Sequence, residues 1–259
     1  KSQFGNNMKS SNPIIRMGFW PGGDRDGNPF VKSSTTLRVA EALRRAIIKC
    51  YYLDVRRLRR RLTFKGVENL VSDLENKLYN NLFIPGHKAD ISKAEILQTL
   101  ADIRAVLEAE HNELFVNLVD ALIFKVELFG LYFASLDIRQ DSSVHKPLME
   151  YIAANTDILP RNYKQLNEQD KIAAILQINS ALDPATLKNE LYRDTLQTVQ
   201  AVKTIQKING EEGCHRYIIS HSTSALDVME VYGLFLMTGW KKSALNIDIV
   251  PLFETIDDL

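Results

Sequence analysis

The segment "GFWPGGDRDGNPFV", residues 18–31, places charged side chains among glycines directly after an apolar run. Glycine allows a backbone to adopt positive φ angles and to approach a ligand closely. Arginine can hold a phosphate or a carboxylate through two parallel hydrogen bonds. These residue types in one short segment indicate a loop that shapes a binding site.

Polar side chains follow three other short apolar runs in the same way. Carboxylates at such places are natural ligands for a hard cation such as Mg²⁺. Together with the first segment they predict a phosphate clamp with a metal ligand. Taken singly, Glu254 could instead complete the first turn of a helix, and the histidines are more often structural than catalytic. The segments are "RQDSSVH" with Arg139 and His145, "HSTS" with His221, and "ETIDD" with Glu254, Asp257 and Asp258.

The charged residues of the first loop also have a simpler interpretation. Asp24, Arg25 and Asp26 could form a salt-bridged turn with no ligand. Arg139 could be the structural partner of Asp137, two residues earlier. Residue types and spacing leave both alternatives open.

The elements that would position these groups are short strands. Buried parallel strands often appear as brief apolar runs followed by polar residues. The last two runs are separated by a helical pattern, which gives a strand–helix–strand unit and predicts a parallel sheet. Ligands of such sheets bind at the carboxyl ends of the strands. The expected strands cover Ile14–Trp20, Leu131–Ile138, Arg216–Ser220 and Ile247–Phe253.

Long helical patterns fill the intervals between these runs. Apolar residues recur every three or four positions from Thr35 to Leu62, which predicts one long amphipathic helix. "SKAE" at residues 92–95 has the spacing of a capping box and predicts another helix start. "DPAT" predicts a helix with Asp183 as its N-cap, which continues to about Gly210.

Composition limits the classes of partner. The formal net charge of the 259 residues is zero, and the basic run "RRLRRR" at residues 56–61 has no interleaved aromatic residue, so nucleic acid is not an expected partner. No apolar run approaches the roughly 20 residues of a membrane span, so no membrane association is expected. The two cysteines lie far apart in sequence, which favours a reducing, cytoplasmic location.

Four segments together resemble phosphoenolpyruvate carboxylase, in the same order along the chain. They are "GFWPGGDRDGNPFV", "LDIRQDSSVH", "YIIS" followed by "LDVMEV", and "VPLFETIDDL". The resemblance runs from about Phe19 to the last residue. It implies an α/β, predominantly helical fold: a partial (β/α)₈ TIM-type barrel of about four parallel strands with long helical insertions. Residues 1–259 would form one partial domain, the central part of that barrel, with a helical insertion at about residues 33–130.

The resemblance also implies a reaction. Phosphoenolpyruvate carboxylase carboxylates phosphoenolpyruvate with bicarbonate, using Mg²⁺ or Mn²⁺, and yields oxaloacetate and phosphate through carboxyphosphate and the enolate of pyruvate. The implied partners are phosphoenolpyruvate and bicarbonate, and the full-length enzyme would be a homotetramer.

The resemblance also implies roles for individual residues in the matching motifs. Arg139 would be the catalytic, substrate-binding arginine that holds the phosphate, and Trp20 and Leu252 would line the site around the substrate's methylene group. Glu254 would be one of two metal ligands. The active-site loop would comprise Gly22, Gly23, Asp24, Arg25, Asp26 and Asn28.

Some features depart from the family pattern. Pro21 stands where methionine is common, Asp141 replaces a frequent glutamate, and His221 occupies a position that is usually apolar. The family's catalytic histidine, its second metal ligand and further arginines fall outside these 259 residues, so we expect the isolated chain to be inactive. Two alternatives remain open: another metal-dependent barrel enzyme that stabilises a pyruvate enolate, such as a carbon–carbon lyase, and a non-catalytic scaffold.

Overall fold

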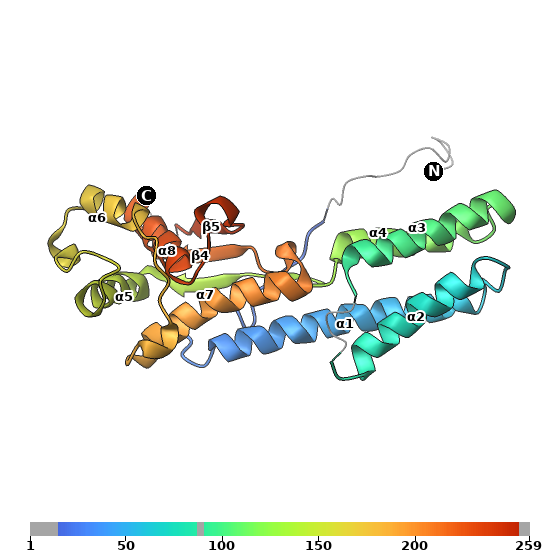
Figure 1. Cartoon of the computed structure of the whole chain (residues 1–259), viewed down its shortest axis with the longest axis horizontal. Coiled ribbons are helices and arrows are strands. Elements are labelled where there is room, and N and C mark those ends of the chain that lie inside the picture. The colour runs from blue at the N-terminus through green and yellow to red at the C-terminus, as the bar shows by residue number, and fades with distance from the viewer. Residues whose placement is uncertain (1–14, 87–90, 254–259) are drawn as a thin grey trace. The chain divides into compact units, whose positions relative to one another are not determined.

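The structure is a computed structural model that describes residues 15–86 and 91–253. These residues are predominantly helical and include a few parallel strands, so the fold class is α/β as predicted (Figure 1). The chain divides into two compact units. We call residues 1–18 and 44–134 the helical unit, and residues 19–43 and 135–259 the strand unit.

The helical unit contains the greater part of one long helix and three further helices. Helix α1 begins in the strand unit and belongs to the helical unit from Arg44 onward. The side chains at the centre of this unit are almost all aliphatic and come from the apolar faces of its amphipathic helices. The Ser92 hydroxyl accepts a hydrogen bond from the backbone N–H of Glu95 at 3.1 Å, which confirms the predicted N-cap. The helices are α1 (Ser33–Arg59), α2 (Glu68–Phe83), α3 (Lys93–Glu110) and α4 (Val116–Phe129).

The basic run of α1 pairs with a neighbouring helix. Arg59 and Arg56 both reach the carboxylate of Glu75 on α2, at 2.7 and 3.5 Å. Arg57 pairs with Asp54 one turn earlier on α1, at 3.2 Å.

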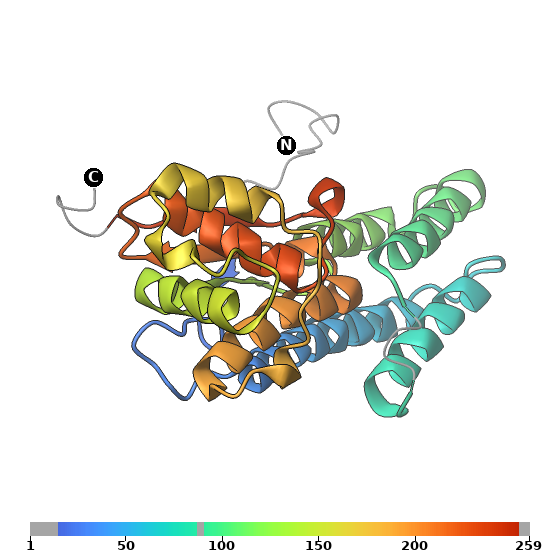
Figure 2. The same ribbon diagram turned by 60° about the vertical axis from the view of Figure 1, so that its left-hand side comes forward.

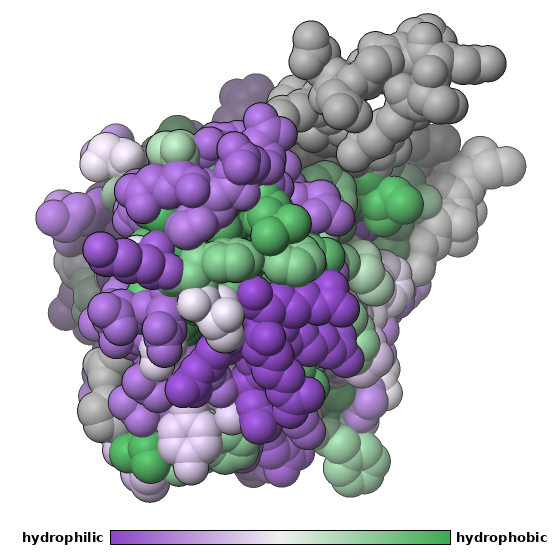
Figure 3. Space-filling view, turned by 90° about the vertical axis from the view of Figure 1, so that its right-hand side faces the viewer, coloured by the Kyte–Doolittle hydropathy of each residue, from purple (hydrophilic) through white to green (hydrophobic). Residues whose placement is uncertain are grey.

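Hydrophilic residues dominate the face of the molecule seen in Figure 3, where a narrow band of hydrophobic residues runs between them.

The described strands form two small sheets. One pairs β1 with β2, and the other, within the strand unit, has the order β3–β4–β5 with parallel neighbours. The predicted strand at 216–220 is confirmed, and the one predicted at 247–253 is a strand over Asp248–Pro251. The predicted strand at 131–138 begins only at Ser135, because Phe133 adopts a positive φ of 65° that an extended strand cannot contain. The strands are β1 (Gly18–Phe19), β2 (Ser135–Leu136), β3 (Ile138–Asp141), β4 (Arg216–Ser220) and β5 (Asp248–Pro251).

Helices cover the larger sheet. Helix α8 packs between α5 and α6 and also contacts β5 and α7 (Figure 2). The strand–helix–strand unit β4–α8–β5 is therefore present as predicted, with its two strands parallel. None of the helices in the described ranges is long and apolar enough to span a bilayer. The helices are α5 (Ser142–Asn155), α6 (Glu168–Leu176), α7 (Glu190–Asn209) and α8 (Ala225–Met237).

One predicted helix start is wrong. Asp183 does cap a turn, but Pro184–Thr186 form only a short 3₁₀ helix, and the buried Leu187 then returns to an extended conformation. The long helix α7 starts at Glu190, where the Asn189 side chain accepts a hydrogen bond from the backbone N–H of Tyr192. Burial of Leu187 against the core overrides the local capping signal.

Candidate active site

The Gly-rich loop lies alongside β3 and is hydrogen-bonded to it through the backbone on both sides of Arg139. The N–H of Arg139 donates to the carbonyl oxygen of Gly23 at 2.9 Å, and its carbonyl accepts from the N–H of Arg25 at 2.8 Å. Gly23 makes this approach possible, because a Cβ atom there would overlap the carbonyl oxygen of Asp137. Residues 22–26 are thus fixed against the strand that carries the predicted phosphate-binding arginine.

Two loop carboxylates and an indole ring hold the Arg139 guanidinium. Nη2 lies 2.8 Å from Oδ2 of Asp26, and Nη1 lies 3.7 Å from Oδ2 of Asp24. The guanidinium carbon stands 5.3 Å from the centre of the Trp20 ring, within the range of a cation–π contact. Trp20, Asp24, Asp26 and Arg139, four of the residues singled out from the sequence, therefore meet in one cluster.

The alternative pairing of Arg139 with Asp137 is not what the structure contains. Oδ1 of Asp137 lies 3.0 Å from Nε of Arg216 on β4, and Oδ2 accepts a hydrogen bond from Nε1 of Trp20 at 3.3 Å. Burial raises the pKa of Asp137 above its ordinary value, an effect that Arg216 opposes. Asp137 therefore orients the indole, and 43% of Trp20 remains exposed.

Arg25 does not join this cluster, although it lies between the two aspartates. Its side chain is buried and contacts Gln140 on β3 and Asp194 and Thr198 on α7. All three charges of residues 24–26 are thus in salt bridges, and each has its partner outside the turn.

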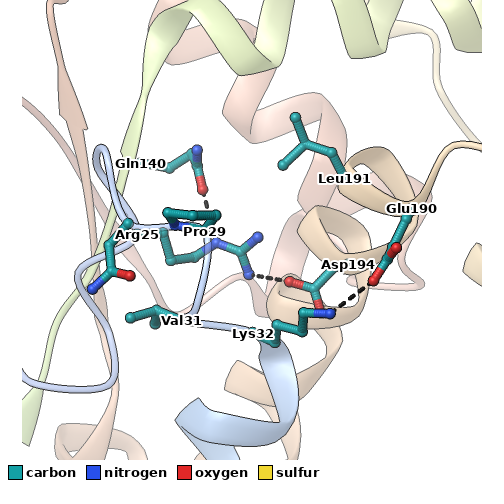
Figure 4. A pocket seen from close by; sticks show the side chains of 9 residues that line it. Arg25, Pro29, Val31, Lys32, Gln140, Glu190, Leu191 and Asp194 are labelled. Atoms are coloured by element: carbon teal, nitrogen blue, oxygen red, sulfur yellow. Dashed lines mark hydrogen bonds and ion pairs between the residues drawn. The ribbon is translucent and has the colours of Figure 1, made fainter.

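A cavity of about 430 Å³ lies beside Arg25. Figure 4 shows the Arg25 guanidinium between Gln140 and Asp194, with the Lys32–Glu190 ion pair at another edge of the cavity. Asn28 of the loop also lines this cavity, and its side-chain oxygen accepts a hydrogen bond from the N–H of Phe30. Gly22 has a φ of 87°, and its carbonyl accepts a 2.7 Å hydrogen bond from the Thr36 hydroxyl.

The remaining predicted site residues follow β5 in the sequence. Leu252 is half-buried and its N–H donates to the carbonyl of Ile219 at 2.8 Å. In the sheet order β3–β4–β5 it is two strands away from Arg139. Glu254, the predicted metal ligand, lies outside the described residues, as do Asp257 and Asp258. Within the described ranges, no three His, Cys, Asp or Glu side chains come together as a possible metal site.

Two residues that depart from the family pattern contact each other at the carboxyl ends of β3 and β4. Nδ1 of His221 lies 2.8 Å from Oδ2 of Asp141. Asp141 also caps α5 through a 2.7 Å bond from the N–H of Ser143. Burial pushes the pKa of Asp141 upward, but the bonds from Ser143 and His221 outweigh burial and lower it. Asp141, which is shorter than the glutamate common in the family, therefore serves as the N-cap of α5 and pairs with His221.

His145 occupies the core. It is fully buried, its Nε2 lies 2.9 Å from the Tyr217 hydroxyl, and burial lowers its pKa to about 3. It is therefore neutral at physiological pH, and it contacts the core rather than the loop.

Three residues of this site were missed by the sequence argument: Gln140, Asp194 and Thr198. Thr198 shares a face of α7 with Val202 and Ile205, so a hydroxyl at a core position was the available signal. Nothing in the local sequence indicates that Asp194 meets a residue 169 positions earlier, since that contact arises only when α7 packs beside the loop.

Comparison with known proteins gives the family. The family model for phosphoenolpyruvate carboxylase matches residues 1–90 and 80–259, which together cover the chain. The chain belongs to the phosphoenolpyruvate carboxylase family. A phosphoenolpyruvate carboxylase of Gloeobacter violaceus is 29% identical over 308 aligned positions, covering 97% of this chain and 33% of that protein. One from Synechococcus sp. is also 29% identical, covering 95% of this chain and 29% of that protein.

The chain therefore spans about a third of the length of these curated phosphoenolpyruvate carboxylases. Its described residues bring the Gly-rich loop, the Trp20 indole and the Arg139 guanidinium into one cluster.

Proposed function

We propose that this chain is part of an enzyme that carboxylates phosphoenolpyruvate with bicarbonate to give oxaloacetate and phosphate. Membership of the phosphoenolpyruvate carboxylase family supports the reaction class. The observation that carries the proposal for these residues is the cluster of Arg139, Asp24, Asp26 and Trp20 beside β3. We also propose that the strand unit is part of a (β/α)₈ barrel.

In this reaction an oxygen of bicarbonate attacks phosphorus, and the bond from phosphorus to the enol oxygen breaks. Carboxyphosphate and the enolate of pyruvate result. Carboxyphosphate then releases CO₂ and phosphate, and the methylene carbon of the enolate attacks CO₂ to form oxaloacetate. Phosphoryl transfer needs cationic donors fixed in place before the reaction. Arg139 would be such a donor, and its two carboxylate partners would fix its orientation.

Trp20 and Leu252 would form the apolar wall beside the methylene carbon. The exposed part of the Trp20 ring is available for this contact, while its N–H is already bonded to Asp137. An apolar wall excludes water, and water would protonate the enolate before CO₂ is attacked.

The cluster cannot hold phosphate unaided. Two carboxylates stand against one guanidinium, so the group of Asp24, Asp26 and Arg139 has a formal charge of −1. Further cationic groups are needed to attract a phosphate ester. We therefore propose that the isolated 259-residue chain is inactive and that other parts of the complete enzyme supply these groups.

The complete enzyme would require Mg²⁺ or Mn²⁺. The described residues do not build a metal site, and Glu254, the candidate ligand, falls outside them. We therefore assign no step of the reaction to a metal held by the described residues. We further propose that the complete enzyme is cytoplasmic and forms a homotetramer. Light scattering on the purified protein would measure its oligomeric state.

The test uses the complete polypeptide that carries this sequence. Phosphate release from phosphoenolpyruvate is measured with Mg²⁺, with and without bicarbonate, and oxaloacetate is quantified. We expect release that depends on bicarbonate and matches oxaloacetate formation. Release without bicarbonate would favour another enolate chemistry, and no release by a folded, metal-loaded protein would favour a scaffold.

Arg139→Gln is the first variant. We expect kcat/KM to fall by about 10² to 10³, as on removal of a fixed donor to a developing charge. Arg161→Gln is the matched control, because Arg161 lies in the same unit and forms an exposed ion pair with Asp157. Equal activity of the two variants would contradict the role of Arg139.

A further inference from the structure

The side chain of Arg25 connects the active-site loop to a helix far away in the sequence. Its Nε donates to Oε1 of Gln140 at 2.8 Å, and Nη1 lies 2.8 Å from Oδ2 of Asp194 and also contacts the Thr198 hydroxyl. The side chains of Arg25 and Asp194 are only 5% and 14% exposed. Little water can reach this ion pair, so it is screened far less than a surface pair.

The same Asp194 carboxylate holds a second point of the loop. Its Oδ1 accepts hydrogen bonds from the N–H of Ser33 at 3.0 Å and from the Ser33 hydroxyl at 2.8 Å. Ser33 is the first residue of α1, directly after the loop. One oxygen of Asp194 therefore binds the middle of the loop and the other binds its end.

The loop residues on either side of Arg25 face Arg139. Asp24 forms a parallel β-bridge with Arg139, so the loop is locally extended here. Side chains of an extended segment alternate between two sides. Arg25 contacts Asp194 and Gln140 on one side, and Asp24 and Asp26 contact the Arg139 guanidinium on the other. Fixing Arg25 therefore also fixes the two carboxylates that orient Arg139.

We propose that Asp194 is a positioning residue for the phosphate-binding arginine. Through Arg25 and Ser33 it holds residues 24–26 against β3, and these residues hold the Arg139 guanidinium in its reactive orientation. Thr198 supports the same contact with a single hydroxyl. The catalytic part of this inference rests on the function proposed above, whereas the positioning of the loop can be measured independently.

Asp194→Asn is the main variant, because it keeps the shape and the acceptor oxygen but removes the charge that Arg25 requires. In the complete enzyme we expect kcat to fall about 10- to 100-fold, since displacement of a catalytic group by about 1 Å can cost 10²-fold. KM for phosphoenolpyruvate should change less than about threefold, because the interaction is needed chiefly in the transition state.

Glu190→Gln is the matched control. Glu190 lies on the same helix one turn earlier, borders the same cavity and loses the same charge, but its partner is the exposed Lys32. We expect its kcat to stay within about twofold of the parent. If Asp194→Asn behaves like Glu190→Gln, the proposal is wrong.

A cycle with Arg25→Gln separates positioning from general damage. If Asp194 acts through Arg25, the double variant should be about as active as Asp194→Asn alone, because the added loss of Arg25 removes little further. Additive losses would contradict this route. Thr198→Val should lower kcat in the same direction by a smaller factor, and it keeps the test decisive if Asp194→Asn does not fold.

Hydrogen exchange gives a readout that needs no activity. The N–H groups of Arg25 and Arg139 are both bonded between the loop and β3. Asp194→Asn should speed exchange in peptides covering residues 20–28 and 137–141, and Glu190→Gln should not. Unchanged exchange would refute the positioning of the loop. If Asp194→Asn speeds exchange but the parent enzyme shows no bicarbonate-dependent activity, the positioning of the loop is retained and only the proposed reaction is refuted.

Discussion

The two units of the chain bury different kinds of side chain. The helical unit has a core of aliphatic residues from four helices, and the charged or amide side chains buried in its described part are Arg44, Glu75 and Asn81. The strand unit buries a larger polar set that includes Arg25, Asp137, His145, Lys171 and Glu230.

This difference shows which unit contains buried charges that reduce the stability of the fold. Buried charges reduce stability unless they are paired, and they persist where they fix the position of other groups. In the strand unit the Arg25–Asp194 pair joins the candidate active-site loop to α7. In the helical unit the buried core is built from the apolar faces of its helices.

The largest expected effect is in the aliphatic core. Leu100 on α3 is completely buried. Leu100→Ala should lower the local free energy of unfolding by about 4 kcal/mol, because it removes apolar contacts and leaves a cavity. Native-state hydrogen exchange of α3 amides would measure this loss, which should be equal at about pH 5 and about pH 8. A strong pH dependence would show that charged groups matter to this core too.

Glu230 should show the opposite behaviour in the strand unit. Its side chain on α8 is 1% exposed, and burial, with help from Asp227, raises its pKa from 4.5 to about 7. The folded state therefore favours the protonated acid. This preference stabilises the folded state fully below the ordinary pKa of 4.5, and the stabilisation is lost as the pH rises through about 7. The loss is roughly 3 kcal/mol, because each pKa unit corresponds to about 1.4 kcal/mol.

Glu230→Gln removes that titration. The melting temperature of the variant should match the parent near pH 5 and exceed it near pH 8. His145 titrates in the opposite sense, since its depressed pKa makes folding less favourable as the pH falls below about 6.5. Because His145 is unchanged in the variant, the difference between the two proteins reports Glu230 alone. An identical pH dependence in both would refute the assignment.

Gly23→Ala tests the close approach of loop and strand. An added Cβ would overlap the Asp137 carbonyl oxygen, so the loop must move away from β3. We expect kcat of the complete enzyme to fall about 10²-fold, the scale of a displaced catalytic group. Gly27→Asn is the control: a Cβ at this position meets open space, and asparagine tolerates the φ of 65° found there. Equal activities would contradict the close contact.

The smallest effect should come from the exposed ion pair. Lys32 and Glu190 are 2.7 Å apart, but their side chains are 53% and 68% exposed. Lys32→Gln should shift the melting temperature by about 1 °C or less, and added salt should abolish the shift. A larger shift would mean that exposed charges matter as much to this unit as the buried pair of Arg25 and Asp194.

Sequence patterns predicted the local elements well where burial and periodicity agreed. The N-cap at Ser92, the end of α7 before Gly210 and the parallel pair β4–β5 all follow from the sequence. The sequence patterns gave wrong element boundaries where the local backbone conformation is set by tertiary packing. Leu187 is buried and ends the turn that Asp183 begins, and the positive φ of Phe133 delays the second predicted strand until Ser135.

The sequence by itself determined the family, through long motifs in a fixed order, and it identified Arg139 and the loop as candidate site residues. Only the tertiary structure decided which charges meet. Asp24, Arg25 and Asp26 are adjacent in sequence, yet an extended backbone sends the middle side chain to α7 and the outer two to Arg139. Partners more than a hundred residues apart are chosen by packing, because local sequence carries no information about which distant helix will cover a loop.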